Sequence, residues 1–490
     1  MIKVILKRGR DESLLRFHPW VFSGAIAEIQ GNPAEGDMVS VHSSDGYFLA
    51  MGHYQIGSIA VRVLSFDDSA LKPDFWETML SNALKVRTAC ALHTPADSHT
   101  NCYRLVHGEG DNLPGLIIDY YDGVCVLQAH SVGMFRAKKQ ISDALQKVYG
   151  QNLKAVYDKS SGTAPFKAGL DLIDGYLYRA DGFESDELVV LENGHKFHVD
   201  WTEGQKTGFF LDQRDNRQLV GQMAKGRKVL NLFCYTGGFS IYALAGGAVH
   251  VDSVDSSKKA MMMVDRNVAL NGFGDNMHTS LCCDAIDYLK NVPEGKYDLM
   301  IVDPPAFAKH RGSLKNALRA YQRLNASAIS KVAPGGLVFT YSCSQVVDKE
   351  AFALAVFSAA AQCGRKVRIL DRLNQPADHS VNIYHPEGVP QVFSTRRPGW
   401  NFIVSARFDE AVFSNNFADD TFTIVAELFL FVSLRVADTT TASIERVFSS
   451  SVKFISIFFP LVIVTCCSAR LWLSDSATRV WVPSGRFFRK

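Results

Sequence analysis

The first part of the chain alternates short apolar runs with turn residues. Three such runs cover residues 38–41, 47–50 and 59–64. The turn pairs Gly36-Asp37 and Asp45-Gly46 come before the first two runs. Strand-length apolar runs bounded by such pairs are typical of β-strands joined by tight turns. We therefore predict a small β-rich domain over residues 1–76.

A mixed pattern follows this domain. Apolar residues recur at helical spacing over residues 73–92 and 134–148, whereas the runs 116–119 and 124–127 have the length and composition of strands. The mixture predicts an α+β middle domain over residues 77–188.

Beyond residue 188, strand-length apolar runs alternate with helical patterns. The strands are expected at residues 229–233, 249–254, 299–302 and 337–341. A strand, a glycine turn, a helix and another strand at this spacing are typical of a parallel sheet with crossover helices. The fold class predicted for residues 189–388 is α/β, with a Rossmann-like sheet.

Residues 389–490 differ in composition from the rest of the chain. They hold fourteen of the 32 phenylalanines, two glycines and no tyrosine. The apolar stretch 454–467 contains Pro460 and is shorter than the about 20 residues that a bilayer crossing needs. We leave this C-terminal tail unassigned and expect no membrane partner.

Composition and charge exclude several classes of protein. With 47% hydrophobic and 21% charged residues in 490, the chain is neither disordered throughout nor a multi-span membrane protein. A net charge of +2 leaves nucleic-acid binding to local basic patches. None of the ten cysteines belongs to a C-x-x-C pair, so no metal site is predicted. The basic N-terminus lacks an apolar signal region, and we predict a cytoplasmic protein.

A cofactor site is predicted where the run 229–233 enters a glycine turn. Gly237 and Gly238 let the backbone approach a ligand at the carboxyl end of a strand. Asp255 ends the next strand, eighteen residues after Gly237, where its carboxylate can accept hydrogen bonds from ribose hydroxyls. This spacing indicates an adenosine-type cofactor. Asp284 is a candidate for the exocyclic amine of adenine, although solvated loop aspartates are common.

Two further loops carry candidate catalytic residues. Asp303 is followed by Pro304 and Pro305, which stiffen the loop after the fourth strand, where a doubly wound sheet places its ligand. Cys343 follows the next strand and lies among serines. Free cysteines are usually core residues, but one at this crevice is placed where a nucleophile would be.

Together these motifs resemble the class I S-adenosylmethionine-dependent methyltransferases, and among them the RlmI-like 23S rRNA cytosine-5 methyltransferases. The resemblance covers residues 1–388 and includes TGFFLDQRDNR at residues 207–217 and RLVHGEGD at residues 104–111. It implies S-adenosylmethionine as cofactor and a PUA-like RNA-binding domain at the N-terminus. The implied partner is 23S rRNA or a large-subunit assembly intermediate, and a homodimer is left open.

The resemblance also implies roles for individual residues. Cys343 would add to C6 of cytosine, and Asp303 would hold the N3 and N4 edge of the base. The implied cofactor contacts are Phe233, Tyr235, Thr236, Gly237, Asp255, Asp284 and Asp303. The implied substrate contacts are Pro304, Pro305, Phe307, Lys309 and Arg311. Many RNA cytosine-5 enzymes have a second cysteine after the loop proline. Here Ala306 follows Pro305, so the base that removes the C5 proton is not assigned.

Two sets of basic residues are candidates for RNA phosphate contacts. One set near the N-terminus is Lys3, Lys7, Arg8, Arg10 and Arg16. The other set follows the loop of Asp303, Pro304 and Pro305, which we call the acid loop. This set is Lys309, Arg311, Lys315, Arg319 and Arg323. Charge runs are usually solvated faces, and we favour the second set because it begins beside the predicted target pocket.

Two other functions remain open. Acid-proline-proline loops also serve guanine and adenine N-methyltransferases, which need no cysteine. A non-catalytic ribosome-assembly factor would keep the fold without turnover. Full activity after replacement of Cys343 by alanine would favour the first alternative. Absence of cofactor binding would favour the second.

This sequence departs from the family pattern after Gly388. A short last strand should complete the sheet there, but an unrelated tail begins, by fusion or by a shifted reading frame. Residues 400–408 alternate enough to supply a replacement strand. Without such a strand a sheet edge would be exposed and would invite aggregation.

Overall fold

The computed structural model describes residues 2–67, 71–93, 99–165, 169–308, 310–344 and 346–385, together with the backbone of residues 401–406. Lys309 lies outside the described residues, and so does the C-terminal tail apart from residues 401–406.

The N-terminal region forms a six-stranded sheet. Its strands are β1 (Ile2–Leu6), β2 (Trp20–Phe22), β3 (Ile26–Gln30), β4 (Met38–His42), β5 (Phe48–Tyr54) and β6 (Ile59–Ser65), with the short helix α1 (Glu12–Leu15) after β1. The strand order is β2-β6-β5-β4-β1-β3. Val4, Val41 and Val61 are fully buried, because alternate side chains of each strand face one core. The β-rich fold predicted for this part of the chain is confirmed.

The middle region is a mixed sheet with two helices. Its strands are β7 (Cys102–His107), β8 (Leu116–Tyr121), β9 (Val124–Ala129), β10 (Ala155–Asp158) and β11 (Gly175–Arg179), and its helices are α2 (Phe75–Ala89) and α3 (Val132–Tyr149). The strand order is β11-β10-β9-β8-β7. Cys125 and Leu127 of β9 pack with α2 and α3, whereas Val124 and Val126 face a second core. Both faces of this sheet are therefore covered.

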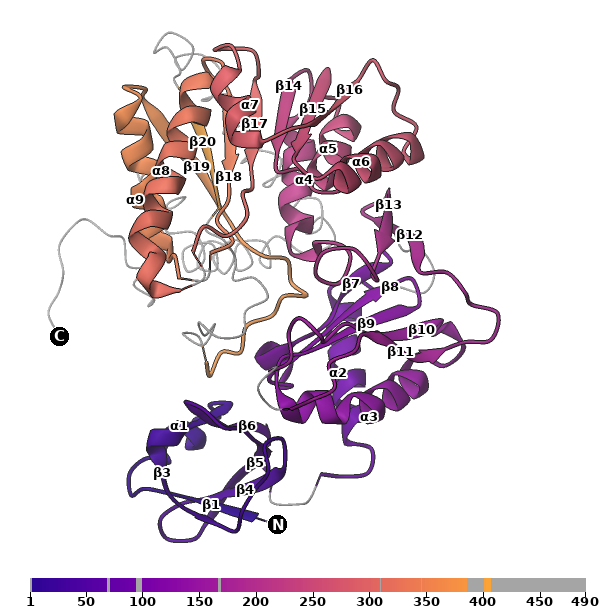
Figure 1. The fold of residues 1–490 in the computed structure, drawn as a ribbon, viewed down its shortest axis with the longest axis vertical. Helices are drawn as coiled ribbons and strands as arrows, with labels where there is room; N and C mark the ends of the chain where they lie inside the picture. Colours follow the sequence, from indigo (N-terminus) through magenta and orange to yellow (C-terminus); the bar gives the residue numbers. More distant parts are fainter. Residues whose placement is uncertain are drawn as a thin grey trace, which may run out of the picture. The chain divides into compact units, whose positions relative to one another are not determined.

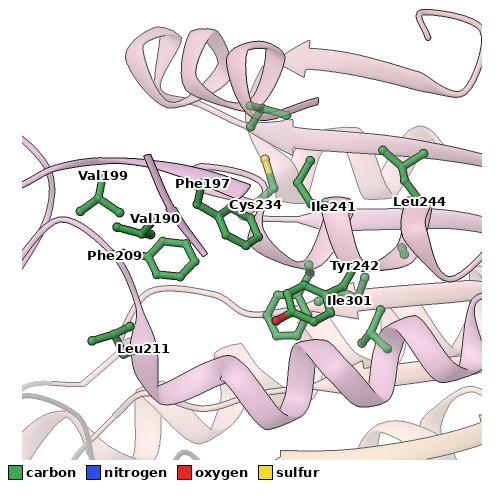
Figure 2. Packing of buried hydrophobic residues seen from close by; sticks show 14 of the residues in the cluster. Val190, Phe197, Val199, Phe209, Leu211, Cys234, Ile241, Tyr242, Leu244 and Ile301 are labelled. Carbon is green, nitrogen blue, oxygen red and sulfur yellow. The ribbon is translucent and has the colours of Figure 1, made fainter. Parts of the chain in front are cut away.

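The hairpin β12 (Glu187–Glu192) and β13 (His195–Asp200) forms part of that second core. It lies across the boundary expected at residue 188. Phe197 of β13 lies between Phe209 and Tyr242, with ring centroids 4.9 and 6.3 Å away (Figure 2). The hairpin thus joins the middle sheet and the helices of the next sheet in one core.

Residues beyond the hairpin form a seven-stranded sheet. Its strands are β14 (Lys228–Leu232), β15 (His250–Asp255), β16 (His278–Cys282), β17 (Leu299–Val302), β18 (Leu337–Thr340), β19 (Val367–Leu373) and β20 (Asn401–Ala406). One face carries α4 (Arg214–Met223), α5 (Gly238–Ala245) and α6 (Lys258–Leu270); the other carries α7 (Ala285–Asn291), α8 (Leu314–Lys331) and α9 (Lys349–Gln362) (Figure 1). Short 3-10 turns include η5 (Leu211–Gln213) and η6 (Arg311–Ser313).

The strand order of this sheet is β16-β15-β14-β17-β18-β20-β19. The first five strands are parallel and follow the order of a Rossmann sheet. The predicted α/β fold class is confirmed. β20 is antiparallel to both of its neighbours.

β20 corrects one expectation and confirms another. The sequence pattern indicated that the family's last strand was lost, yet β20 occupies a place inside the sheet. Residues Asn401–Ala406, within the alternating stretch, supply this strand, as the alternation predicted. The sheet edge that would otherwise be bare on β18 is paired.

Within the part of the chain that the structure describes, no helix combines the length and the apolar character that a membrane crossing requires.

Candidate active site

The strand order reverses between β14 and β17, and this is where a doubly wound sheet opens a crevice at its carboxyl edge. The glycine loop follows β14 and the acid-proline loop follows β17, so the two loops leave adjacent strands. Asp255 ends β15 and Cys343 follows β18, at the same edge. The sheet topology therefore brings the predicted cofactor and catalytic residues to one end of the sheet.

The glycine loop has an unusual backbone. Phe233, Tyr235 and Gly237 all have left-handed conformations, with φ of 57, 50 and 80°. A non-glycine residue in this region costs on the order of 1–3 kcal/mol, and such strain clusters at ligand sites. At Gly237 a Cβ atom would lie 3.1 Å from Cγ1 of Val264. The loop therefore needs a glycine at this position.

Side chains behind the loop hold its conformation. Asn267 Nδ2 donates to the carbonyl of Thr236 at 2.9 Å. The Tyr235 hydroxyl donates to the carbonyl of Gly208 at 3.2 Å and accepts from the amide of Gln205 at 2.9 Å. The segment just before η5 is thus part of the site, a role that the sequence interpretation did not give it.

Asp255 lies under the loop. Its Oδ2 accepts from the amide of Tyr235 at 3.0 Å, and its Oδ1 accepts from the amide of Ser257 at 2.9 Å. A carboxylate offers about four acceptor positions, so two bonds leave it able to accept from a diol.

Asp284 caps α7. Its Oδ1 accepts from the amides of Ile286 and Asp287, each at 2.9 Å, and the side chain is exposed. Helix capping explains an aspartate at this position without any ligand. Its contact with adenine stays a prediction.

Two catalytic candidates lie on neighbouring loops. Cys343 Sγ donates to the carbonyl of Pro304 at 3.2 Å, next to Asp303. Ser344 joins the same loops, since its Oγ accepts from the amide of Ala308 at 3.3 Å. Cys343 and Asp303 are both half-buried, so a substrate can reach them.

The acid loop packs on α8. The ring of Phe307 lies 4.7 Å from that of Tyr321, whose hydroxyl is 2.8 Å from Ser344 Oγ. Pro304 is buried and Pro305 is exposed. Phe307 therefore has a packing role beside its predicted substrate contact, and Pro305 faces solvent.

Two side chains near Asp303 were not among the predicted site residues. Gln213 Nε2 donates to Asp303 Oδ2 at 3.4 Å. The Tyr341 hydroxyl is buried and finds no hydrogen-bond partner among the described residues. Burial, followed by the charge of Asp303, raises the pKa of Tyr341 well above its usual value, so the phenol stays protonated. The only available signal was the position of Gln213 in the 207–217 motif.

Basic side chains follow the loop of Asp303, Pro304 and Pro305 and continue along α8. Arg311 in η6 and Lys315, Arg319 and Arg323 in α8 are all exposed. Their spacing of four residues places them along one helix face, about 6 Å apart per step.

Buried ion pairs anchor α4 behind the site. Arg217 donates to both carboxylate oxygens of Glu192, at 2.8 and 2.7 Å, and to the carbonyl of Phe210 at 2.9 Å. Arg214 pairs with Asp378 at 2.5 Å. A Cβ atom at Gly238 would lie 3.0 Å from Cδ of Arg217, which shows how closely this pair supports the glycine loop.

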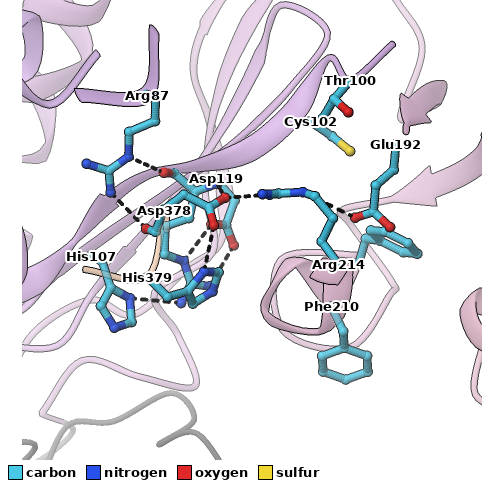
Figure 3. Close-up of polar contacts among 12 residues, drawn as sticks. Arg87, Thr100, Cys102, His107, Asp119, Glu192, Phe210, Arg214, Asp378 and His379 are labelled. Atoms are coloured by element: carbon cyan, nitrogen blue, oxygen red, sulfur yellow. Dashed lines mark hydrogen bonds and ion pairs between the residues drawn. The ribbon is translucent and has the colours of Figure 1, made fainter. Parts of the chain in front are cut away.

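Asp378 belongs to the connection between β19 and β20 and lies among cationic groups (Figure 3). Its Oδ2 also accepts from the amide of Arg104 on β7 at 2.9 Å, and Arg87 Nη2 donates to its carbonyl at 2.8 Å. Burial alone would raise the pKa of Asp378, but the charges of Arg214 and His379 hold it well below its usual range. This carboxylate thus joins the middle sheet to α4.

Comparison with known proteins gives two family matches. A family model described as S-adenosylmethionine-dependent methyltransferase matches residues 104–383, and a model of a PUA-like domain matches residues 4–66. A ribosomal RNA large subunit methyltransferase I from Aeromonas hydrophila is 39% identical over 391 residues, which cover 79% of this chain and 96% of that protein. The protein of the same name from Shewanella amazonensis is 37% identical over 391 residues, with 79 and 97% covered.

A putative S-adenosylmethionine-dependent methyltransferase from Streptococcus mutans shares the fold. Its structure aligns with a TM-score of 0.66 at 22% identity, over 83% of this chain and 100% of that one.

Proposed function

Because the chain belongs to the S-adenosylmethionine-dependent methyltransferase family, together with the ribosomal RNA large subunit methyltransferase I proteins, we propose that it methylates C5 of a cytosine in 23S rRNA. The observation that carries the cytosine chemistry is the contact of Cys343 Sγ with the Pro304 carbonyl, since it holds a thiol beside Asp303. A nucleophile and an acidic group on adjoining loops are what attack on a pyrimidine ring requires.

The residues of the crevice fit the cofactor of this family. The left-handed turn at Phe233, Tyr235 and Gly237 opens the backbone, and the carboxylate of Asp255 has acceptor positions for ribose hydroxyls. We assign Thr236 to the same site, and Asp284 to adenine. When bound, S-adenosylmethionine supplies an electrophilic methyl group on a sulfonium. The protein's part is to bind it and to make C5 nucleophilic.

Cys343 makes C5 nucleophilic by covalent addition. Its thiolate forms a bond to C6 of cytosine, and the electron pair of the C5–C6 double bond becomes available at C5. C5 takes the methyl group, a base removes the C5 proton, and elimination of the thiolate restores the ring. Asp303 holds the N3 and N4 edge of the base, with its carboxylate accepting a hydrogen bond from the N4 amino group.

The RNA substrate must present an unstacked base. A cytosine inside a helix cannot be reached by Cys343, so the target lies in a loop or is flipped out of one. We assign Pro304, Pro305, Phe307, Lys309 and Arg311 to the substrate side of the crevice. Lys315 and Arg319 continue this surface along α8 and are placed to contact phosphates.

The domain boundaries and the cell compartment belong to the same proposal. We divide the chain into an RNA-binding domain over residues 1–76, a middle domain over 77–188 and a methyltransferase domain over 189–388. A protein that acts on ribosomal RNA belongs in the cytoplasm.

The test is incubation with S-adenosylmethionine and unmodified large-subunit rRNA, followed by nucleoside mass spectrometry. We expect 5-methylcytosine from the unaltered protein and none from Cys343→Ala. The control Cys363→Ala replaces a thiol that is also half-buried but is bonded to the Ala326 carbonyl at 3.0 Å, away from the site, and should keep activity.

A second measurement tests the covalent step. RNA that carries 5-fluorocytidine has no C5 proton to lose, so elimination stops and the adduct survives denaturation. We expect such an adduct with the unaltered protein and not with Cys343→Ala. A methylated guanine or adenine that Cys343→Ala still produces would contradict the proposal. Cofactor-binding protein without any product would favour the assembly-factor function.

A further inference from the structure

The side chain of Gln213 lies between two polar groups. Its Nε2 donates to Asp303 Oδ2 at 3.4 Å, and its Oε1 accepts from Asn216 Nδ2 at 2.6 Å. Asn216 presents its amide nitrogen, which can only donate, so the oxygen of Gln213 must face Asn216. The nitrogen of Gln213 must then face Asp303. Gln213 and Asn216 are both buried, so water does not compete readily for these bonds.

The donor is attached to an immobile part of the chain. Gln213 ends η5 and immediately precedes α4, and Asn216 lies in the first turn of that helix. Arg214 and Arg217 fix α4 through their buried pairs with Asp378 and Glu192. A donor held in this way cannot follow a carboxylate that rotates, so it selects one orientation of that carboxylate.

We propose that Gln213 is a positioning residue that fixes the carboxylate of Asp303 as a hydrogen-bond acceptor for the amino group of the target cytosine. The inference rests on the proposed function. Cytosine presents an amino donor at N4, whereas uracil presents an acceptor at O4. An N–H donor behind the carboxylate favours its ionised form, which only accepts. Gln213 thereby supports the choice of cytosine over uracil without touching the base.

The long distance of the contact fits this role. Hydrogen bonds of catalytic groups are commonly long in the absence of substrate and tighten in the complex. The bond can therefore shorten when the base is bound and the carboxylate of Asp303 is held against its amino group. Its loss should lower the rate of methyl transfer more than it weakens cofactor binding.

The experiment compares Gln213→Met with a control on the same helix. Methionine keeps the length of the side chain and removes both hydrogen bonds. The control is Gln218→Met, because Gln218 is exposed and lies on α4. At saturating cofactor and RNA, we expect single-turnover methylation to fall about 10- to 100-fold for Gln213→Met, the range for one bond to a charged group. The KM for S-adenosylmethionine should stay close to that of Gln218→Met, whereas the thermal midpoint should fall by about 2–8 °C because the buried amide of Asn216 loses its acceptor.

A change in the substrate separates positioning from a general structural effect. The target cytidine is first located by mass spectrometry of ribonuclease fragments of the methylated RNA. It is then replaced by a pyrimidin-2-one ribonucleoside, which lacks the amino group. If Gln213 acts through that amino group, Gln213→Met should slow this substrate less than twofold. An equal 10- to 100-fold loss on both substrates, or no loss on cytidine, would overturn the inference.

The proposed function is tested separately by the unaltered protein. Formation of 5-methylcytosine and of the 5-fluorocytidine adduct by that protein shows that the reaction itself stands, whatever Gln213→Met does. A failure of both in the unaltered protein would reject the proposed function and leave Gln213 without a reaction to support.

Discussion

Two residues of the glycine loop have uncommon backbone conformations. Tyr235 and Phe233 adopt left-handed conformations although both carry large side chains. Contacts from Gly208, Gln205 and Asp255 to Tyr235 compensate for that strain. At this scale the site depends on main-chain shape as much as on side-chain chemistry.

Gly237→Ala tests the importance of that shape. A left-handed alanine costs about 1–2 kcal/mol, and here its methyl group would also contact Val264. We expect calorimetry to show cofactor affinity at least tenfold weaker. Gly226→Ala is the control, because Gly226 also has a left-handed φ, of 73°, and no atom lies within 4 Å of the added Cβ. The control should lose a similar free energy of unfolding and keep its affinity for the cofactor. Equal cofactor affinities in the two variants would contradict the role of the loop.

The sequence was sufficient to predict Asp255, Asp303 and Cys343 at one edge of a sheet, since each follows an apolar strand. It was not sufficient to predict Gln213. Its contact with Asp303 joins residues 90 positions apart, and it depends on how α4 packs rather than on local pattern. The left-handed backbone conformation of Phe233 could not be predicted from the amino-acid composition either.

Elements predicted from periodicity agree closely with the structure. The run 299–302 is β17, and the helical pattern 134–148 lies within α3. The hairpin β12 and β13 and the strand β11 were not predicted as elements. Their half-buried pattern gives weak periodicity, and long-range packing fixes their pairing.

The contact between α3 and β5 provides a test at this scale. A Cβ atom at Gly133 would lie 2.2 Å from Cγ of the buried His53 ring. Alanine normally favours a helix over glycine by about 1 kcal/mol, but here the clash should dominate and destabilise the protein by about 1–3 kcal/mol. Urea unfolding measures the change. Gly312→Ala, with no atom within 4 Å, should be nearly neutral. A stabilising Gly133→Ala would contradict the packing.

The basic face of α8 predicts a salt dependence. Each phosphate contact to single-stranded RNA adds about 0.7 to the slope of log K against log salt. Replacing Lys315 and Arg319 together by glutamine should reduce that slope by about 1.4. The control replaces the exposed Lys139 and Lys147 of α3 in the same way and should change the slope little. Equal slopes for the two double variants would place the RNA elsewhere.

At the scale of the whole molecule, buried polar groups connect regions distant in sequence. Asp378 contacts α4 and β7, and Asn382 Nδ2 donates to the carbonyl of Glu109 at 3.1 Å. The ring of His385 lies 4.4 Å from that of Trp20. The connection after β19 therefore touches each of the three folded regions.

Buried histidines predict how stability depends on pH. Burial, with the charge of Arg62, lowers the pKa of His53 to about 4, and burial, with Lys206, Arg104 and Arg62, lowers that of His130 to about 3. In the unfolded chain both titrate near 6.5. The unfolded state therefore binds more protons below pH 6.5, and stability falls as pH drops from 6.5 toward 4.

The slope should be about 1.4 kcal/mol per pH unit for each histidine. His53→Gln removes one titrating group and should flatten the dependence between pH 6 and 4.5, as measured by urea unfolding at each pH. The exposed His310→Gln should leave it unchanged. An unaltered slope in His53→Gln would show that His53 is protonated in the folded protein.

The position of β20 has a consequence for how the chain is made. The ribosome delivers β18, α9 and β19 before β20, yet β20 must lie between β18 and β19. In the interval β18 and β19 are free to pair directly, as parallel strands joined by a helix commonly do. Insertion of β20 must then undo that pairing. We expect pulsed hydrogen exchange during refolding to protect the amides of β18 and β20 together and late. The nascent protein is thus most vulnerable to self-association just before β20 arrives.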